Sequence, residues 1–207
     1  MRFLRLALDI LFPPRDTESL VRDATLSELG RFVHPQMLAD GRVSLMPYRT
    51  PLARALIQEA KFRGNERAAA LLGNVLREYL RSWLEEHEPF EARSVILVPL
   101  PLSKERLKER GYNQSERIAV HALSKLPEVR LEALVVRTRD TLPQTSLPRR
   151  ERLRNMEAAF SAALPLSGAH TYIVFDDVST TGATLAAATA ALYRAGAKEV
   201  LPLSLAH

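Results

Sequence analysis

Two carboxylates followed by a loop of small hydroxyl residues are the part of this sequence best suited to chemistry. They stand in the stretch VFDDVSTTGATL, residues 174–185. Where a strand passes into a helix, the first N–H groups of the helix have no intrahelical partner and can bind an anion. Gly182 permits a positive φ and a close approach of that anion. The residues predicted to hold a phosphate are Ser179, Thr180, Thr181, Gly182, Ala183 and Thr184.

The two acids, Asp176 and Asp177, must face another part of the ligand, because carboxylates repel a bound phosphate. Vicinal sugar hydroxyls suit them, since each hydroxyl donates a hydrogen bond to an ionised acid. A ribose 5-phosphate unit satisfies both halves of such a site. The alternative is a turn whose Asp and Thr residues only cap a helix, as a single such residue usually does. Six consecutive matching positions favour the ligand site.

Other phosphate-binding motifs do not fit this stretch. It lacks the Gly-Lys-Ser/Thr of a Walker A loop and the GxGxxG of a dinucleotide site. The adjacent acids also lack the Asp-x-Asp spacing of a haloacid-dehalogenase-type phosphatase. A sugar phosphate therefore remains the predicted ligand.

The elements that position these residues alternate between strands and helices. Apolar, β-branched runs predict strands at 94–98, 133–136, 171–175 and 200–205, and periods of three and four predict helices from 51, from 65, at 115–126 and at 183–195. This alternation predicts an α/β fold with a mainly parallel sheet flanked by helices, in which ligands bind at the carboxyl ends of the strands. Residues 15–47 lack a sustained period and are expected to be loosely structured.

The composition limits the kinds of site and the compartment. The 207-residue chain carries a formal net charge of +5 and no cysteine, so disulfides and thiolate-bound zinc are excluded. Such a chain fits a reducing cytoplasm. Arg5 and Asp9 interrupt the apolar start MRFLRLALDILFPP, which therefore predicts a short amphipathic helix and not a secretory leader. No apolar run approaches the ~20 residues of a membrane span.

Positive charge gathers in two stretches. Residues 104–110 hold four cations against two acids, and residues 137–154 hold six arginines against two acids. Such clusters attract the phosphates of a small ligand or of a nucleic acid backbone. The alternative for either cluster is an ordinary solvated basic surface.

Four blocks of sequence resemble known proteins. VFDDVSTTGATL resembles the phosphoribosyl-diphosphate signature of type I phosphoribosyltransferases. Residues 48–64, 98–119 (VPLPLSKERLKERGYNQSERIA) and 137–160 resemble blocks of the ComF/GntX family. Because these blocks cover most of residues 48–207, the chain is identified as a member, with a type I phosphoribosyltransferase-like domain at 48–207. The segment 1–47 then stands where the family carries a cysteine zinc ribbon, and without cysteines no zinc is expected.

The resemblance implies 5-phosphoribosyl-1-diphosphate with Mg²⁺ as the ligand. Its chemistry would displace diphosphate at the anomeric carbon through an oxocarbenium-like transition state. Asp176 and Asp177 would be the catalytic pair, and Ser103 and Lys104 would bind the diphosphate. Residues 137–155 resemble the mobile loop that closes over such sites. Family positions of second rank are Lys61, Arg110, Asn113, Gln114, Gln144, Arg152 and Asn155.

Two functions follow from the family. The first is a competence protein of DNA uptake and natural transformation that binds phosphoribosyl diphosphate, with catalysis left open because no hood for an acceptor base is identified. The second is a non-catalytic adaptor that binds single-stranded DNA or a DNA-import helicase, its phosphoribosyl site serving as a sensor or relic. The basic stretches fit either function, although aromatic residues among them are few (Tyr112 and Phe160).

Overall fold

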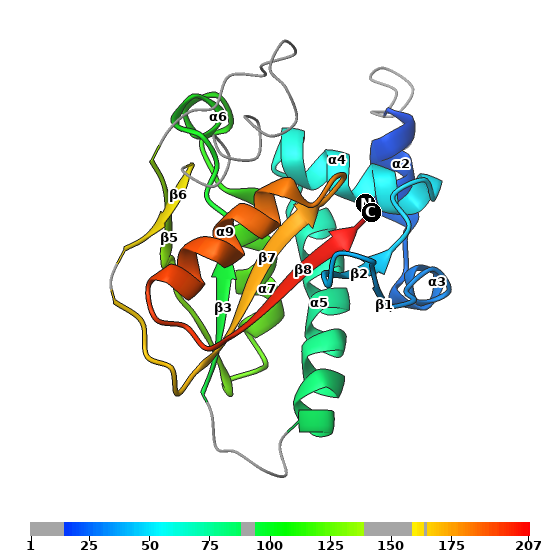
Figure 1. The fold of residues 1–207 in the computed structure, drawn as a ribbon. Helices are drawn as coiled ribbons and strands as arrows, with labels where there is room; N and C mark the ends of the chain where they lie inside the picture. Colours follow the sequence, from blue (N-terminus) through cyan, green and yellow to red (C-terminus); the bar gives the residue numbers. More distant parts are fainter. Residues whose placement is uncertain (1–14, 88–93, 139–158, 164) are drawn as a thin grey trace.

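A six-stranded sheet forms the centre of the molecule in the computed structural model, which describes residues 15–87, 94–138, 159–163 and 165–207 (Figure 1). The strand order is β1-β2-β8-β7-β3-β4, and every pairing is parallel except that of β1 with β2. The strands of this sheet are β1 (Gln36–Met37), β2 (Val43–Met46), β3 (Val95–Pro99), β4 (Val129–Leu131), β7 (Thr171–Val178) and β8 (Glu199–Ala206).

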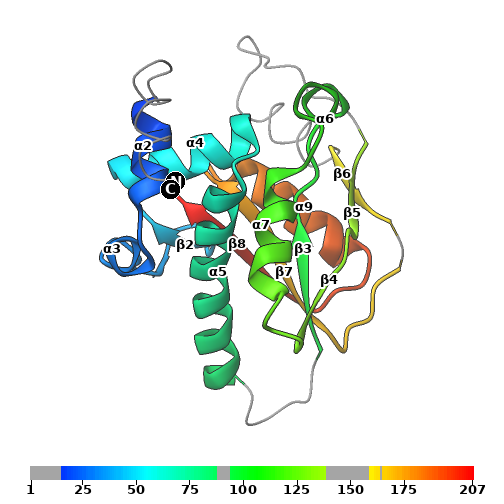
Figure 2. The same ribbon diagram turned by 180° about the vertical axis from the view of Figure 1, so that it is seen from behind.

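Helices cover both faces of the sheet. The helix α9 (Ala183–Arg194) lies on the face seen in Figure 1, beside a two-stranded ribbon of β5 (Val135–Arg137) and β6 (Phe160–Ala162). On the face seen in Figure 2 lie α5 (Glu66–His87) and α7 (Gln114–Leu123). The other helices among the described residues are α2 (Asp16–Asp23), α3 (Leu26–Gly30), α4 (Pro51–Arg63) and α6 (Lys104–Arg110).

Side-chain alternation along β7 divides the core in two. Tyr172 and Val174 pack in the cluster beneath α9, whereas Ile173 and Phe175 pack in the larger cluster beneath α5 and α7. Both faces of this strand are therefore apolar, which is why its sequence reads as a continuous apolar run. The run ends at Asp176, where the strand reaches the edge of the sheet that faces the candidate site.

The predicted fold class is confirmed: the chain has the α/β fold of a phosphoribosyltransferase-like domain, with a mainly parallel sheet flanked by helices and a small N-terminal segment. Among the described helices, none combines the length and the apolar character needed to cross a lipid bilayer.

Two expectations about individual elements are wrong. The run at 133–136 falls in β5, outside the main sheet, and the strand that pairs with β3 is β4. Residues 15–47 are not loosely structured: they form α2, α3, β1 and β2, and β2 pairs in parallel with β8. Eight and five residues of helix in α2 and α3 are too few turns for a helical period to stand out.

Candidate functional site

Asp177 is held at the end of β7 by side chains from two helices. Its side chain is only 3% exposed, and its Oδ1 accepts a hydrogen bond from Gln114 Nε2 at 3.3 Å. Its Oδ2 lies 3.5 Å from Nζ of Lys61 on α4, yet accepts no hydrogen bond. A buried carboxylate oxygen without a hydrogen-bond donor is costly, and a ligand hydroxyl could supply that donor.

Asp176 is held by α7 and by its own neighbour. Its Oδ1 accepts hydrogen bonds from Ser115 Oγ at 3.0 Å and from the backbone N–H of Asp177 at 2.9 Å. Burial raises the pKa of Asp176 well above its usual value, and the adjacent Asp177 carboxylate raises it further. Two adjacent carboxylates in such surroundings destabilise the free protein. They indicate a site that accepts hydrogen bonds from the donors of a ligand.

The raised pKa of Asp176 predicts a pH-dependent gain in stability for Asp176→Asn. The native state holds the Asp176 proton more tightly than the unfolded chain, so the wild type loses stability as pH rises from the unfolded pKa through the raised native value. The neutral Asn cannot lose a proton. Above that window we expect the variant to melt about 2–4 °C higher, for a gain of ~1 kcal/mol, and the gap to close near the ordinary Asp pKa.

Thermal melts followed by circular dichroism across the pH range measure this effect. Asp23→Asn is the matched control, because Asp23 is 76% exposed and pairs only at the surface with Arg22. An Asp176→Asn melting curve that keeps the pH slope of the wild type would contradict the raised pKa.

The loop that follows the acids passes from β7 into α9. Its N-terminal end is fixed by the N–H of Ser179, which donates to Ala206 O at 3.0 Å, and Gly182 begins the helix with φ 76°. Within the part of the chain that the structure describes, the N–H groups of Thr180, Thr181, Gly182 and Thr184 make no hydrogen bond. These groups lie at the positive end of the α9 dipole, so the loop can receive an anion.

The turn that follows β3 lies beside the candidate site, because β3 is the neighbour of β7 in the sheet. Pro99 of β3 pairs with Phe175 of β7, so the residues that follow the two strands share one edge of the sheet. Ser103 caps α6 by accepting the N–H of Arg106 at 3.2 Å, and Lys104 is the exposed first residue of that helix. No described contact joins Ser103 or Lys104 directly to the two acids.

A hydrogen-bonded chain joins the second-rank residues to the acids. Arg110 Nη1 donates to Gln114 Oε1 at 3.0 Å, and Gln114 contacts Asp177. Asn113 caps α7 and donates to Leu100 O at 2.9 Å, which ties this helix to the end of β3. Of the second-rank residues, Lys61 and Gln114 thus contact Asp177, Arg110 reaches it through Gln114, and Asn113 makes no described contact with the acids. Gln144, Arg152 and Asn155 lie outside the described residues.

Sequence reasoning missed two residues at this site. Ser115 follows Gln114 directly within a recognised block, so its place beside Asp176 could have been suspected from the block itself. Arg42 donates to Ser179 Oγ and to Thr180 O, which lie 137 and 138 residues away in the sequence. No local sequence pattern predicts such a contact.

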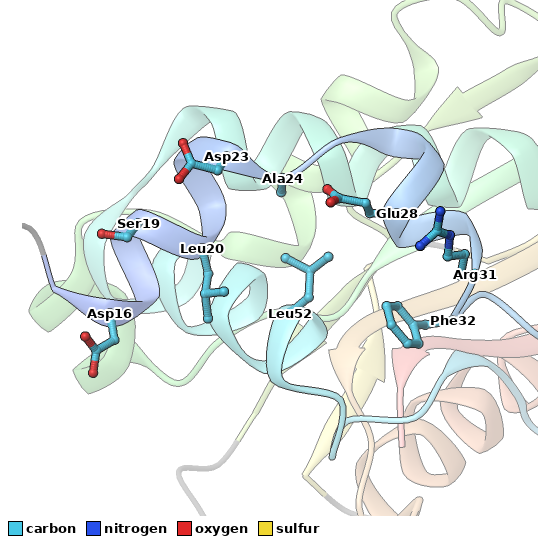
Figure 3. Close-up of a pocket in the computed structure, with 9 residues that line it drawn as sticks. All are labelled: Asp16, Ser19, Leu20, Asp23, Ala24, Glu28, Arg31, Phe32 and Leu52. Carbon is cyan, nitrogen blue, oxygen red and sulfur yellow. The ribbon is translucent and has the colours of Figure 1, made fainter.

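A separate pocket lies away from this site. It has a volume of about 620 Å³ and opens between α2, α3 and α4 (Figure 3). Three of its lining residues are acidic and one is a cation, so it is poorly suited to a phosphate. Its lining residues, none of which is a predicted site residue, are Asp16, Ser19, Leu20, Asp23, Ala24, Glu28, Arg31, Phe32 and Leu52.

Known proteins resemble this chain over most of its length. It is 37% identical over 159 residues to DNA utilization protein YhgH of Salmonella typhi. The matched residues make up 76% of this chain and 68% of that protein. It is 30% identical over 170 residues to Competence protein F of Haemophilus influenzae, covering 81% and 73%. Competence protein ComFC of Bacillus subtilis is 31% identical over 147 residues, covering 70% and 55%. No family model matches the chain. The extent of these identities shows that the chain belongs to the ComF family.

Proposed function

We propose that this chain binds 5-phosphoribosyl-1-diphosphate together with Mg²⁺ and acts in DNA uptake or utilization. The observation that supports it most is the continuity of the site: Asp176 and Asp177 end a buried strand, and the next residues form a loop with free N–H groups at the start of α9. The acids would accept hydrogen bonds from the ribose hydroxyls, and the N–H groups of the loop would bind the 5-phosphate.

The surroundings of the acids favour this ligand. Burial and mutual repulsion raise the pKa of Asp176, and two donated hydroxyls would favour the ionised pair. Mg²⁺ would take its ligands from diphosphate oxygens and water, as it commonly does with substrate phosphates, and would offset the charge of the leaving group. If transfer occurs, the bond from the anomeric carbon to diphosphate breaks while a nucleophile bonds to that carbon. The acids would then stabilise positive charge on the ring.

The biological role is inferred from the relatives. Proteins named for DNA utilization and for competence share 30–38% identity with this chain. We propose that such a role would be carried out in the cytoplasm, beside an ATPase or helicase that imports DNA. Ligand binding at Asp176 and Asp177 would then respond to the supply of activated ribose.

Calorimetry with phosphoribosyl diphosphate tests the proposal directly. We expect saturable binding in the presence of Mg²⁺, weaker binding when the metal is chelated, and a matching rise in melting temperature. Adenosine 5′-monophosphate, which lacks the diphosphate at the anomeric carbon, serves as the comparison ligand. Absence of both heat and stabilisation at millimolar ligand would overturn the proposal.

A second candidate function is a single-stranded-DNA-binding adaptor, and one surface favours it. Phe62 is 60% exposed, with Arg110 Cζ 5.0 Å and Lys61 Nζ 5.9 Å from its ring centroid. Nearby on the same side, Arg117 Cζ lies 4.4 Å from the ring centroid of Tyr112. An exposed ring such as Phe62 among cations is the kind of platform on which bases stack while the nucleic acid backbone meets positive charge.

Replacing Phe62 tests the stacking surface. We expect Phe62→Ala to weaken binding of a short oligothymidylate about 10-fold, within the 1–3 kcal/mol typical of one stacked base. A fluorescence anisotropy titration at several salt concentrations measures the affinity and its salt slope. Tyr193→Ala is the control, since Tyr193 is 48% exposed but lies on α9 across the sheet. Equal losses in both variants, or no binding by the wild type at low salt, would contradict this function.

A further inference from the structure

A hairpin turn from the N-terminal segment reaches the anion-binding loop. The turn joins β1 to β2 and is closed by the N–H of Leu38, which donates to Arg42 O at 2.8 Å, and by the N–H of Gly41, which donates to Leu38 O at 2.9 Å. Gly41 takes φ 82°, which allows the chain to turn there. The turn directs Arg42 toward the loop, and the Arg42 side chain is only 7% exposed.

The Arg42 guanidinium holds two successive residues of the loop. Its Nη1 donates to Ser179 Oγ, and its Nη2 donates to Thr180 O at 3.0 Å. Its Nε lies 3.1 Å from Asp40 Oδ2 but makes no hydrogen bond. A second buried polar atom of the site, Asp177 Oδ2, also lacks a hydrogen-bond partner. Each atom faces an opposite charge, Arg42 Nε beside Asp40 and Asp177 Oδ2 beside Lys61, but keeps a hydrogen-bonding capacity that the described residues do not fill.

The contact with Thr180 O determines where the next N–H points. In a trans peptide unit the carbonyl oxygen of one residue and the N–H of the next point in opposite directions, and the described chain has no cis peptide bond. Because the guanidinium holds Thr180 O on its own side, the N–H of Thr181 faces the other way. A carbonyl turned outward at this point would repel an anion, and the guanidinium prevents that.

Gly182 shows how closely the loop packs on the guanidinium. A Cβ at this residue would lie 2.8 Å from Arg42 Nη1, 2.9 Å from Arg42 Cζ and 2.5 Å from Asp40 Oδ2. The missing side chain therefore leaves room for a cation that stands outside the strand–loop–helix motif itself.

We propose that Arg42 is a positioning residue of the phosphate subsite, which it completes from the N-terminal segment by aiming the Thr181 N–H at the anion. This inference rests on the proposed binding of phosphoribosyl diphosphate. It adds a long-range residue to a phosphate subsite that otherwise consists of the consecutive residues 179–184. It also makes the affinity for the 5-phosphate depend on the position of the β1–β2 turn.

Another arginine of this chain, Arg67, ties the N-terminal segment in place without contacting the loop, and it represents a purely structural role. Arg67 of α5 donates to Val21 O at 3.0 Å and to Ala24 O at 2.8 Å, so it also ties the N-terminal segment to the rest of the molecule through a guanidinium. It makes no described contact with the phosphate loop. Arg67→Met is therefore the matched control for Arg42→Met.

Two measurements test the inference. Hydrogen exchange of the free protein reports on the Ser179 N–H, the loop amide that donates to Ala206 O, and calorimetry well below the melting temperature reports the affinity for phosphoribosyl diphosphate with Mg²⁺. We expect Arg42→Met to speed exchange in this loop and to weaken binding about 10- to 100-fold, as for loss of charged hydrogen bonds. Arg67→Met is expected to leave both unchanged. Arg42→Lys is expected to fall between, because an ammonium cannot hold two partners in a fixed fork.

The outcomes separate this inference from the proposed function. Unchanged loop exchange or unchanged affinity in Arg42→Met overturns the positioning role while leaving ligand binding intact. Equal effects in Arg42→Met and Arg67→Met reduce Arg42 to a structural anchor and also overturn it. A wild type that binds no phosphoribosyl diphosphate defeats the proposed function, and loop exchange alone then decides whether Arg42 orders the loop. If Arg42→Met does not fold, Arg42→Lys carries both measurements.

Discussion

Replacing both carboxylates at the end of β7, as Asp176→Asn/Asp177→Asn, is expected to weaken binding of phosphoribosyl diphosphate by about 100-fold or more. Each acid would lose a hydrogen bond from a ribose hydroxyl to a charged acceptor, and such bonds contribute about 1.5–3 kcal/mol each. The Asn side chains keep the shape of the acids, and the Ser115 hydroxyl and the Gln114 amide can still donate to their Oδ1 atoms. Loss of binding would therefore reflect lost charge at the ligand.

Calorimetry on the folded double variant makes this measurement, and Glu66→Gln is its control. Glu66 is an acid that pairs with Arg117 and His121 at the surface, and it makes no described contact with the two aspartates. Affinity that survives in the double variant, or that falls equally in Glu66→Gln, would show that the ribose is not held by Asp176 and Asp177.

Gly182→Ala is the second change with a large expected effect. Its Cβ would lie 2.5 Å from Asp40 Oδ2 and 2.8 Å from Arg42 Nη1, and Ala would have to adopt φ 76°. Left-handed backbone and overpacking together cost about 2–5 kcal/mol, so either the loop moves or the β1–β2 turn is displaced. Both movements misalign the N–H groups of the loop, and we expect phosphoribosyl diphosphate binding to be lost.

Gly111→Ala separates the two causes. Gly111 also has φ 76°, but a Cβ there meets no atom within 4 Å. This variant loses stability only through the left-handed backbone conformation, by about 1–2 kcal/mol. It is expected to have a lower melting temperature and an unchanged affinity for the ligand. Thermal melts and calorimetry on the two variants give the comparison. Normal ligand binding by Gly182→Ala would mean that the loop conformation does not govern the site.

The sequence was most informative where the site is continuous along the chain. Asp176 to Thr184 run through the end of one strand, one loop and the start of one helix, so a local sequence pattern could predict this placement. The strand at β4 was missed for a physical reason. It lies at the edge of the sheet, and only Val129 of its three residues is buried, so it gives almost no apolar signal. The more apolar run nearby forms β5, in a separate ribbon.

Contacts between distant segments could not be read from the sequence. Lys61 reaches Asp177 only because α4 packs near the end of β7, and Arg42 reaches the loop only because β2 pairs with β8. Both depend on tertiary packing, which periodicity does not encode. The domain boundary at residue 47 and the ligand assignments stay predictions, although β2 shows that residues before 48 contribute to the sheet.

The pairing of β2 with β8 has a consequence for the order in which the protein matures. Ser204 donates to Val43 O across 161 residues, and the β1–β2 turn supports the phosphate loop from the same side of the molecule. A nascent chain therefore cannot finish this site until β8 has left the ribosome, and closure over such a span is slow compared with local folding. Until then, β2 can pair only with β1, and the edge that later pairs with β8 is open. The support that the β1–β2 turn gives to the loop would therefore follow the synthesis of β8.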